Sequence, residues 1–183
     1  SGLGEVLGKY WDHHGLIRMK YDGDGTPLPN LAKKSNLHEW NEMGKHFFER
    51  RQYEQAIFCF EKGENEEGRK LANAYLLRQV ARDSIHDSDN DIIKSNFIAA
   101  AKSFKKCSRP IQAASCYQDI EMHKEAGDVY YEWNIFESAG NCYVKCKEWK
   151  KAGECYEKSK KYVEAVIAYK NGGYYDIVVD LMQ

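Results

Sequence analysis

Small and aromatic residues recur at a spacing of thirteen residues along most of this chain. Six alanines stand at this spacing, namely Ala100, Ala113, Ala126, Ala139, Ala152 and Ala165. The next position is small in five of the six units and is filled by Ala101, Ala114, Gly127, Gly140, Gly153 and Val166. An aromatic ring comes four positions after each alanine, at Phe104, Tyr117, Tyr130, Tyr143, Tyr156 and Tyr169. These positions fall on one side of a helix, so each unit predicts a short helix with a single apolar stripe.

The length of the unit predicts how the helices connect. It leaves about nine residues for a helix and about four for a turn, so successive helices run antiparallel and two units form one helical hairpin. Such a hairpin spans 26 residues. The small residues let neighbouring helices approach closely, and the rings fill the space between adjacent hairpins. Because helices this short are marginal alone, stacking supplies most of their stability. The predicted fold is an all-α, right-handed solenoid of helical hairpins.

The same pattern appears on both sides of the main block. Upstream it is formed by Trp40, Met43, Gly44, Phe47, Tyr53, Ala56, Cys59 and Phe60, and at the end by Tyr175, Val178, Val179 and Met182. Two longer helices are predicted to interrupt the array of short ones. The first covers Glu66–Arg82, and the second starts near Ile92 after a polar loop over Asp83–Asp91. We expect the acidic end of this loop to cap the second helix.

The first 36 residues follow a different pattern. Apolar residues at helical spacing, Leu3, Val6, Leu7, Tyr10 and Trp11, predict an amphipathic helix that ends at Gly15. An extended segment over 16–21 and a loop or linker over 22–30, with two Asp-Gly pairs and two prolines, follow it. The sequence therefore predicts an N-terminal segment over 1–36 and a solenoid over 37–183.

Composition and charge agree with a folded helical chain. Of its 183 residues, 43% are apolar and 30% charged, and only three are prolines. This composition favours helices and excludes a wholly disordered chain. With 27 basic against 28 acidic residues, the chain has no overall field that would draw it to nucleic acid or an anionic membrane.

No targeting or membrane segment is recognisable. No apolar run approaches the roughly 18 residues that a membrane span needs, and nothing resembles a signal peptide. We therefore expect an intracellular protein, cytoplasmic or nuclear, without a membrane partner. Because the chain starts at Ser1 and its last helical pattern stops at Gln183, we also expect a monomeric piece of a longer protein.

The chemistry-bearing residues predict no catalytic, metal or cofactor site. Three of the six cysteines, Cys116, Cys142 and Cys155, share one repeat position on the apolar stripe, and no Cys-x-x-Cys pair exists. The six histidines are scattered, and the acidic clusters lack the glycine and terminal glutamate of a calcium-binding loop. We expect no enzyme in this chain and no bound cofactor.

One pattern resembles a known repeat family. Its positions are Trp40, Met43, Gly44, Phe47, Ala56 and Phe60, and the spacing persists in Gly127, Tyr130, Ala139 and Tyr143 and in Gly153, Tyr156, Ala165 and Tyr169. In order and spacing it resembles the signature of the tetratricopeptide repeat, which implies a helical-hairpin superhelix that binds protein partners. The hairpins here are 26 residues long, shorter than is usual in that family.

A second resemblance covers roughly residues 5–183. It is carried by Lys9-Tyr10-Trp11, Gly15-Leu16-Ile17, Trp40, Gly44, Phe47, Ala56, Cys59-Phe60-Glu61-Lys62, Leu71-Ala72 and Leu77-Arg78. These segments resemble the region that follows the motor in large UvrD-like helicases, a group that includes the fungal UvrD-like proteins and the tetratricopeptide-and-ankyrin-repeat proteins. The resemblance implies a parent superfamily-1 ATP-dependent nucleic-acid helicase. No phosphate-binding Gly-Lys-Ser/Thr loop occurs in this chain, so ATP hydrolysis would reside elsewhere in that parent.

Lysine-rich stretches are the candidate binding regions. Eight lysines lie between Lys145 and Lys170 against four glutamates, and a second group runs from Lys94 to Arg109. If the first helix of each hairpin lines a concave groove, as in tetratricopeptide proteins, nine side chains face a protein or peptide partner. They are Lys45, Lys102, Lys105, Lys106, Asp128, Tyr131, Lys150, Glu154 and Glu157.

Three interpretations of these charges stay open. They are ordinary solvated lysines, a protein-binding surface, or contacts to a phosphate backbone. We expect a non-catalytic protein-interaction scaffold. The alternative is an accessory nucleic-acid-contacting module of the parent helicase, with weak binding through the lysine clusters.

Overall fold

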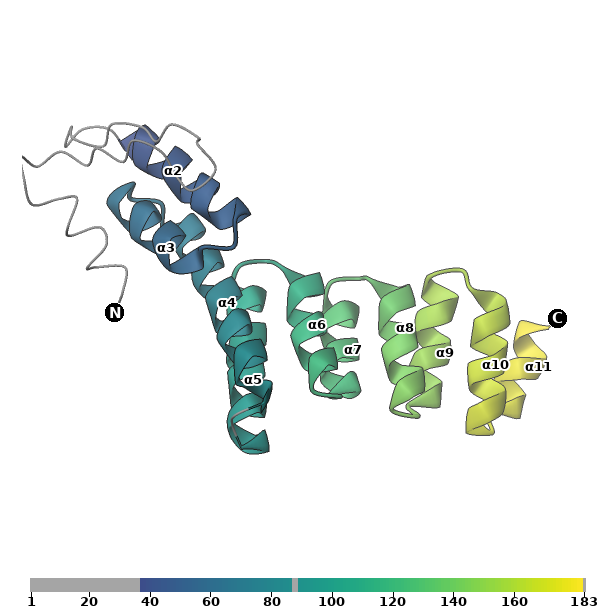
Figure 1. Ribbon diagram of the computed structural model, residues 1–183. Coiled ribbons are helices and arrows are strands. Elements are labelled where there is room, and N and C mark those ends of the chain that lie inside the picture. Colours follow the sequence, from purple (N-terminus) through teal and green to yellow (C-terminus); the bar gives the residue numbers. More distant parts are fainter. Residues whose placement is uncertain (1–36, 87–88, 183) are drawn as a thin grey trace, which may run out of the picture. The chain divides into compact units, whose positions relative to one another are not determined.

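The computed structural model describes residues 37–86 and 89–182, and over these ranges the chain contains helices and no strands (Figure 1). The chain divides into two compact units, whose boundary falls inside one helix between Leu76 and Leu77. The helix, extended segment and linker predicted over residues 1–36 lie outside the described residues.

The first unit is a helical hairpin followed by the start of a longer helix. Helices α2 (Leu37–Glu49) and α3 (Tyr53–Lys62) pack against each other, and α4 (Glu66–Asp83) follows. The buried core is formed by Trp40, Met43, Phe47, Ala56, Cys59, Phe60 and Ala72. Gly44 is needed for this packing, because a Cβ atom there would lie 2.6 Å from Cδ1 of Phe60. The upstream copy of the sequence pattern is therefore a packed hairpin.

The second unit contains the array of short helices. After the end of α4 and a 3₁₀ turn (Ser84–His86) come α5 (Asn90–Lys106), α6 (Pro110–Asp119), α7 (His123–Glu132), α8 (Phe136–Lys145), α9 (Trp149–Lys158), α10 (Tyr162–Gly172) and α11 (Tyr175–Leu181). Each of the helices from α5 onward packs mainly against its neighbours in the chain. The prediction of an all-α array of helical hairpins, with two longer helices among the short ones, is confirmed.

The join between the two long helices differs slightly from the prediction. Asp83 belongs to α4, and α5 begins at Asn90, two residues before the predicted start at Ile92. The earlier start has a local cause, because the Asp89 carboxylate accepts a hydrogen bond from the backbone N–H of Asp91 at 3.4 Å. This bond is the acidic cap that the sequence predicts.

The repeated small residues form the contact between consecutive helices. All six alanines of the pattern are completely buried. The glycine after the alanine lies under the ring of the next helix, sixteen residues further along the chain. A Cβ atom added at Gly127 or Gly140 would lie 2.9 Å from Cε1 of Tyr143 or Tyr156, and one at Gly153 would lie 2.5 Å from Cε1 of Tyr169. We call this repeated contact of a small residue with the next ring the seam.

The turns repeat as regularly as the seam. The left-handed backbone conformation occurs at Arg51, Glu64, Ser108, Glu121, Asn134, Lys147, Lys160 and Gly173. The residue that follows it joins two helices. The backbone N–H of Glu148, for example, donates to the carbonyl of Tyr143 at 2.9 Å, and its own carbonyl accepts from Ala152 at 2.9 Å. This is a Schellman-type ending, which satisfies carbonyls at the end of a helix.

These two bonds set the length of the repeat. The ring residue and the next alanine are nine positions apart, as in Tyr143 and Ala152, because one residue bonds to both. The alanine and its own ring residue are four positions apart, which is about one helical turn. The sum is the thirteen-residue period.

The first prediction concerns the seam at Gly153. Glycine to alanine within a helix ordinarily stabilises by about 0.5–1 kcal/mol. Here we expect Gly153→Ala to destabilise the chain by roughly 1–2 kcal/mol, because the new methyl group overlaps the ring of buried Tyr169. Denaturant unfolding measures this change. In a Tyr169→Leu background the same substitution should cost less, and an equal cost in both backgrounds would rule out the ring as the cause.

Candidate functional site

Alternate helices of the second unit share a surface. Lys105 of α5 forms an ion pair with Glu132 of α7, with Nζ and Oε2 2.6 Å apart. Lys158 of α9 donates a hydrogen bond to the hydroxyl of Tyr131, also on α7. These pairs are 27 residues apart in the sequence, close to the length of one hairpin. Helices α5, α7 and α9 therefore present a common surface, which we call the charged face.

Eight of the nine candidate residues from the sequence belong to the charged face. They are Lys102, Lys105 and Lys106 on α5, Asp128 and Tyr131 on α7, and Lys150, Glu154 and Glu157 on α9. The ninth, Lys45, lies in the first unit. There it pairs with Glu42 at 2.6 Å and lines a pocket of about 240 Å³ next to Phe48 and Leu71.

Four candidates on the charged face are held by other side chains of the chain. Lys105 and Tyr131 form the contacts with Glu132 and Lys158 given above. Asp128 accepts a hydrogen bond from the hydroxyl of Tyr143 at 2.6 Å, and Glu157 accepts one from Tyr169. Burial, and after it these two carboxylates, raises the pKa of both tyrosines above the usual range. The side chains of the other four, Lys102, Lys106, Lys150 and Glu154, form no hydrogen bond or ion pair within the described ranges.

Tyrosine hydroxyls donate hydrogen bonds to the preceding helix at a regular spacing of fifteen residues, which we call the tyrosine register. Tyr143 bonds to Asp128 and Tyr156 bonds to Asn141 at 2.7 Å, and in each case the acceptor directly follows the glycine under the ring. Tyr169 instead uses Glu157, three residues after the corresponding position. The sequence carried the signal for this register, since polar residues stand immediately after Gly127 and Gly140. The sequence predicts that Asp128 faces a partner but does not reveal that it also accepts a hydrogen bond from Tyr143.

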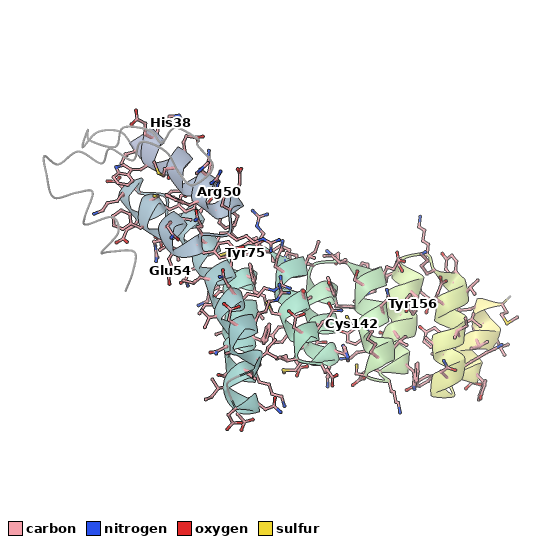
Figure 2. All side chains as sticks on the ribbon, in the orientation of Figure 1. His38, Arg50, Glu54, Tyr75, Cys142 and Tyr156 are labelled. Carbon is pink, nitrogen blue, oxygen red and sulfur yellow. The ribbon has the colours of Figure 1, made fainter. Side chains whose placement is uncertain are left out.

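A second surface is formed by helices α6, α8 and α10. Nε2 of Gln118 on α6 approaches Sγ of Cys142 on α8 at 3.3 Å, and Lys161, which precedes α10, pairs with Glu137 of α8 at 3.4 Å. Figure 2 labels Cys142 and Tyr156, which come from the adjacent helices α8 and α9. We call this second surface the amide face, after the amide side chains of Gln118 on α6 and Asn141 on α8.

The amide face contains a pocket of about 480 Å³. Its lining residues are Gln118, Tyr130, Ser138, Asn141, Val144, Lys145 and Tyr156. None of them is among the nine predicted site residues. The thirteen-residue period explains the omission: every helix carries the same apolar pattern, so the sequence does not show which set of alternate helices encloses a hollow.

The cysteines lie mainly in the core. Cys59, Cys116, Cys142 and Cys155 are buried, and Cys107 and Cys146 are half-buried. Burial raises the pKa of the Cys59 thiol to about 12 and those of Cys116 and Cys155 to about 11. Among the residues that the structure describes, no group of three or more His, Cys, Asp or Glu side chains is placed to hold a metal ion.

Two further findings bear on the class of protein. No helix in the described part of the chain is both long and apolar enough to cross a membrane. The chain matches no known protein-family model, and no curated protein sequence matches it.

The second prediction concerns thiol reactivity. At pH 8.5 in the native protein we expect iodoacetamide to modify Cys107 and Cys146, and to spare the four buried cysteines. Raising the thiol pKa by about two units lowers the thiolate fraction roughly 100-fold, and burial adds a steric barrier. Mass spectrometry of the digested protein reads out each site, and labelling in denaturant is the control in which all six react. Native labelling of Cys155 as fast as Cys146 would contradict the packing.

Proposed function

We propose that this chain is a non-catalytic scaffold that binds a protein or peptide partner. The observation that supports it most is the charged face, where side chains one hairpin apart along the sequence meet on one surface. A stacked array of this kind presents an extended surface built from many side chains, which suits an extended peptide or a partner helix.

Residues on the charged face would have two different roles in binding, since some shape the surface and others contact the partner. Asp128, Tyr131 and Glu157 hold neighbouring helices together through their own contacts and give the surface its shape. Lys102 and Lys106 are exposed on α5 and form no ion pair within the described ranges. Acidic groups of a partner would bind these two lysines with little competition from the chain itself.

The parent protein in this proposal is a large UvrD-like helicase. The basis is the resemblance of segments such as Lys9-Tyr10-Trp11 and Cys59-Phe60-Glu61-Lys62 to the region after the motor in that group. The array would be the interaction region of the parent, and the ATP-dependent motor would lie outside this chain. A tetratricopeptide-like array with 26-residue hairpins is the corresponding architectural proposal, with the chain acting inside the cell.

The alternative is that the lysines contact nucleic acid. The unpaired Lys102 and Lys106 favour it, together with the nearby Lys94. Against it, two lysines of the stretch from Lys145 to Lys170 pair with carboxylates of the chain, since Nζ of Lys151 lies 3.9 Å from Oδ1 of Asp128 and Lys161 pairs with Glu137. Peptide binding is therefore the better-supported function.

The third prediction tests the charged face. We expect the immobilised chain to retain specific proteins from a cell extract, and the Lys102→Glu/Lys106→Glu variant to retain them about ten-fold less, a loss of roughly 1.4 kcal/mol. Quantitative mass spectrometry of the eluted proteins measures the change. Lys160→Glu/Lys170→Glu is the matched control, because it changes the net charge equally and both residues are exposed outside the charged face.

Two outcomes would count against this proposal. The first is retention no greater than that of a bare matrix. The second is tight binding of single-stranded oligothymidylate that weakens steeply with salt and is lost in Lys102→Glu/Lys106→Glu, since counterion release would then identify phosphate as the ligand.

A further inference from the structure

Tyr130 of α7 brings its hydroxyl to the pocket on the amide face. Tyr130 is only 8% exposed, and its hydroxyl forms no hydrogen bond within residues 37–86 and 89–182. In the register of the other tyrosines its acceptor would be Ser115, directly after Ala114. The Ser115 hydroxyl is instead bound by Nη2 of Arg78 at 2.6 Å. Because Tyr130 lines the pocket, its hydroxyl is available to a ligand there as donor or acceptor.

Asn141 supplies a fixed hydrogen-bond donor on the same pocket. Its Oδ1 accepts from the Tyr156 hydroxyl at 2.7 Å, which orients the amide and leaves both hydrogens of Nδ2 available. The hydrogen bond from the tyrosine hydroxyl requires only an oxygen acceptor at this position. One helix earlier, a carboxylate oxygen of Asp128 accepts from Tyr143 in the same way. The amide nitrogen of Asn141 is therefore surplus to the packing.

Gln118 supplies a matching acceptor from α6. Its Nε2 is directed at Sγ of Cys142 at 3.3 Å, and this contact leaves Oε1 available. The pocket thus carries an oriented amide donor on α8 and an oriented amide acceptor on α6. Such a pair is complementary to the C=O and N–H groups of a peptide backbone.

The surroundings of the pocket are apolar as well as polar. Val144 is part of the lining, and on α10 of the same face Val163 and Ile167 are 71% and 53% exposed. Among the described residues that line the pocket, Lys145 carries the one charged side chain. The volume of about 480 Å³ lies within the usual range for ligand sites, which are mostly apolar with a few placed polar groups.

We propose that this pocket binds the backbone of an extended peptide segment, with an aliphatic side chain of that segment packed against Val144. Asn141 donates to a backbone carbonyl, Gln118 accepts from a backbone N–H, and Tyr130 supplies the third polar contact. This inference rests on the proposed scaffold function. It places the peptide on the amide face, which offers amide and hydroxyl groups, and not on the charged face. Single-stranded nucleic acid fits less well, because Tyr130 and Tyr156 are almost fully buried and Lys145 alone would meet phosphate.

The test uses peptides selected on the whole chain. Twelve-residue peptides from a random phage library are selected on the immobilised wild-type protein and resynthesised with acetylated and amidated ends. Titration calorimetry then compares wild-type with Asn141→Asp, which keeps an oxygen for Tyr156 and removes the Nδ2 donor. Asn73→Asp is the matched control, since it makes the same amide-to-carboxylate exchange at an exposed position of α4 that does not line the pocket.

We expect Asn141→Asp to weaken peptide binding at least ten-fold and Asn73→Asp to change it less than two-fold. Thermal melts check that both variants are folded, and the side-chain amide signals of Asn141 and Gln118 in the wild-type protein should shift when peptide is added. Each backbone nitrogen of the peptide can also be methylated in turn. We expect binding to be lost at one position only, where the backbone N–H donates to Gln118.

Several results would overturn the inference. If the peptides bind Asn141→Asp as well as wild-type, the pocket is not their site, while the scaffold function still stands. The same holds if their binding is lost only in Lys102→Glu/Lys106→Glu. If no peptide binds, the inference and the proposed function both fail. If oligothymidylate binds instead and is lost in Asn141→Asp, the ligand of the pocket is nucleic acid.

Discussion

The contact of a small residue with the ring of the next helix is the constraint on which the second unit depends. A glycine or alanine removes the side chain that would hold two helices apart, and a buried tyrosine or phenylalanine occupies the space. The turns from Ser108 to Lys160 leave little freedom, because the residue after each left-handed position bonds to the ring residue five positions before it and to the alanine four positions after it. Since a ten-residue helix has little stability of its own, folding and packing must occur together.

The same constraint gives the array two different surfaces. Each helix packs through one stripe of small and aromatic residues. Its other positions face outward, and those of alternate helices lie together on one of two surfaces, the charged face or the amide face. On α5, α7 and α9 these positions carry ions that pair across helices, such as Lys105 with Glu132. On α6 and α8 they carry amides and hydroxyls around a pocket. The packing rule is thus uniform along the array, while the chemistry available to a partner differs between the two faces.

Much of this architecture could be predicted from the sequence. The period, the stripe and the two longer helices all follow from side-chain size, because close packing leaves only small residues at the helix contacts. The start of α5 was predicted two residues late, since the Asp89 cap depends on a local backbone geometry. The candidate site was harder to predict. The sequence predicts that Asp128 and Glu157 face a partner, and the structure adds that they accept hydrogen bonds from Tyr143 and Tyr169. The sequence shows that a side chain is charged, but not whether another side chain of the same chain is bonded to it.

Hydrogen exchange of the native protein tests the central claim most directly. The residues that join two helices, Met122, Ile135, Glu148 and Lys161, each donate their backbone N–H to the carbonyl of a buried tyrosine. If the seam and the turns form one packed structure, these four amides should exchange as slowly as amides inside α7, α8 and α9, and in the same cooperative opening. Exchange at the rate of an unstructured chain, with the helices still protected, would show that the turns are loose connectors and that the seam does not set the period.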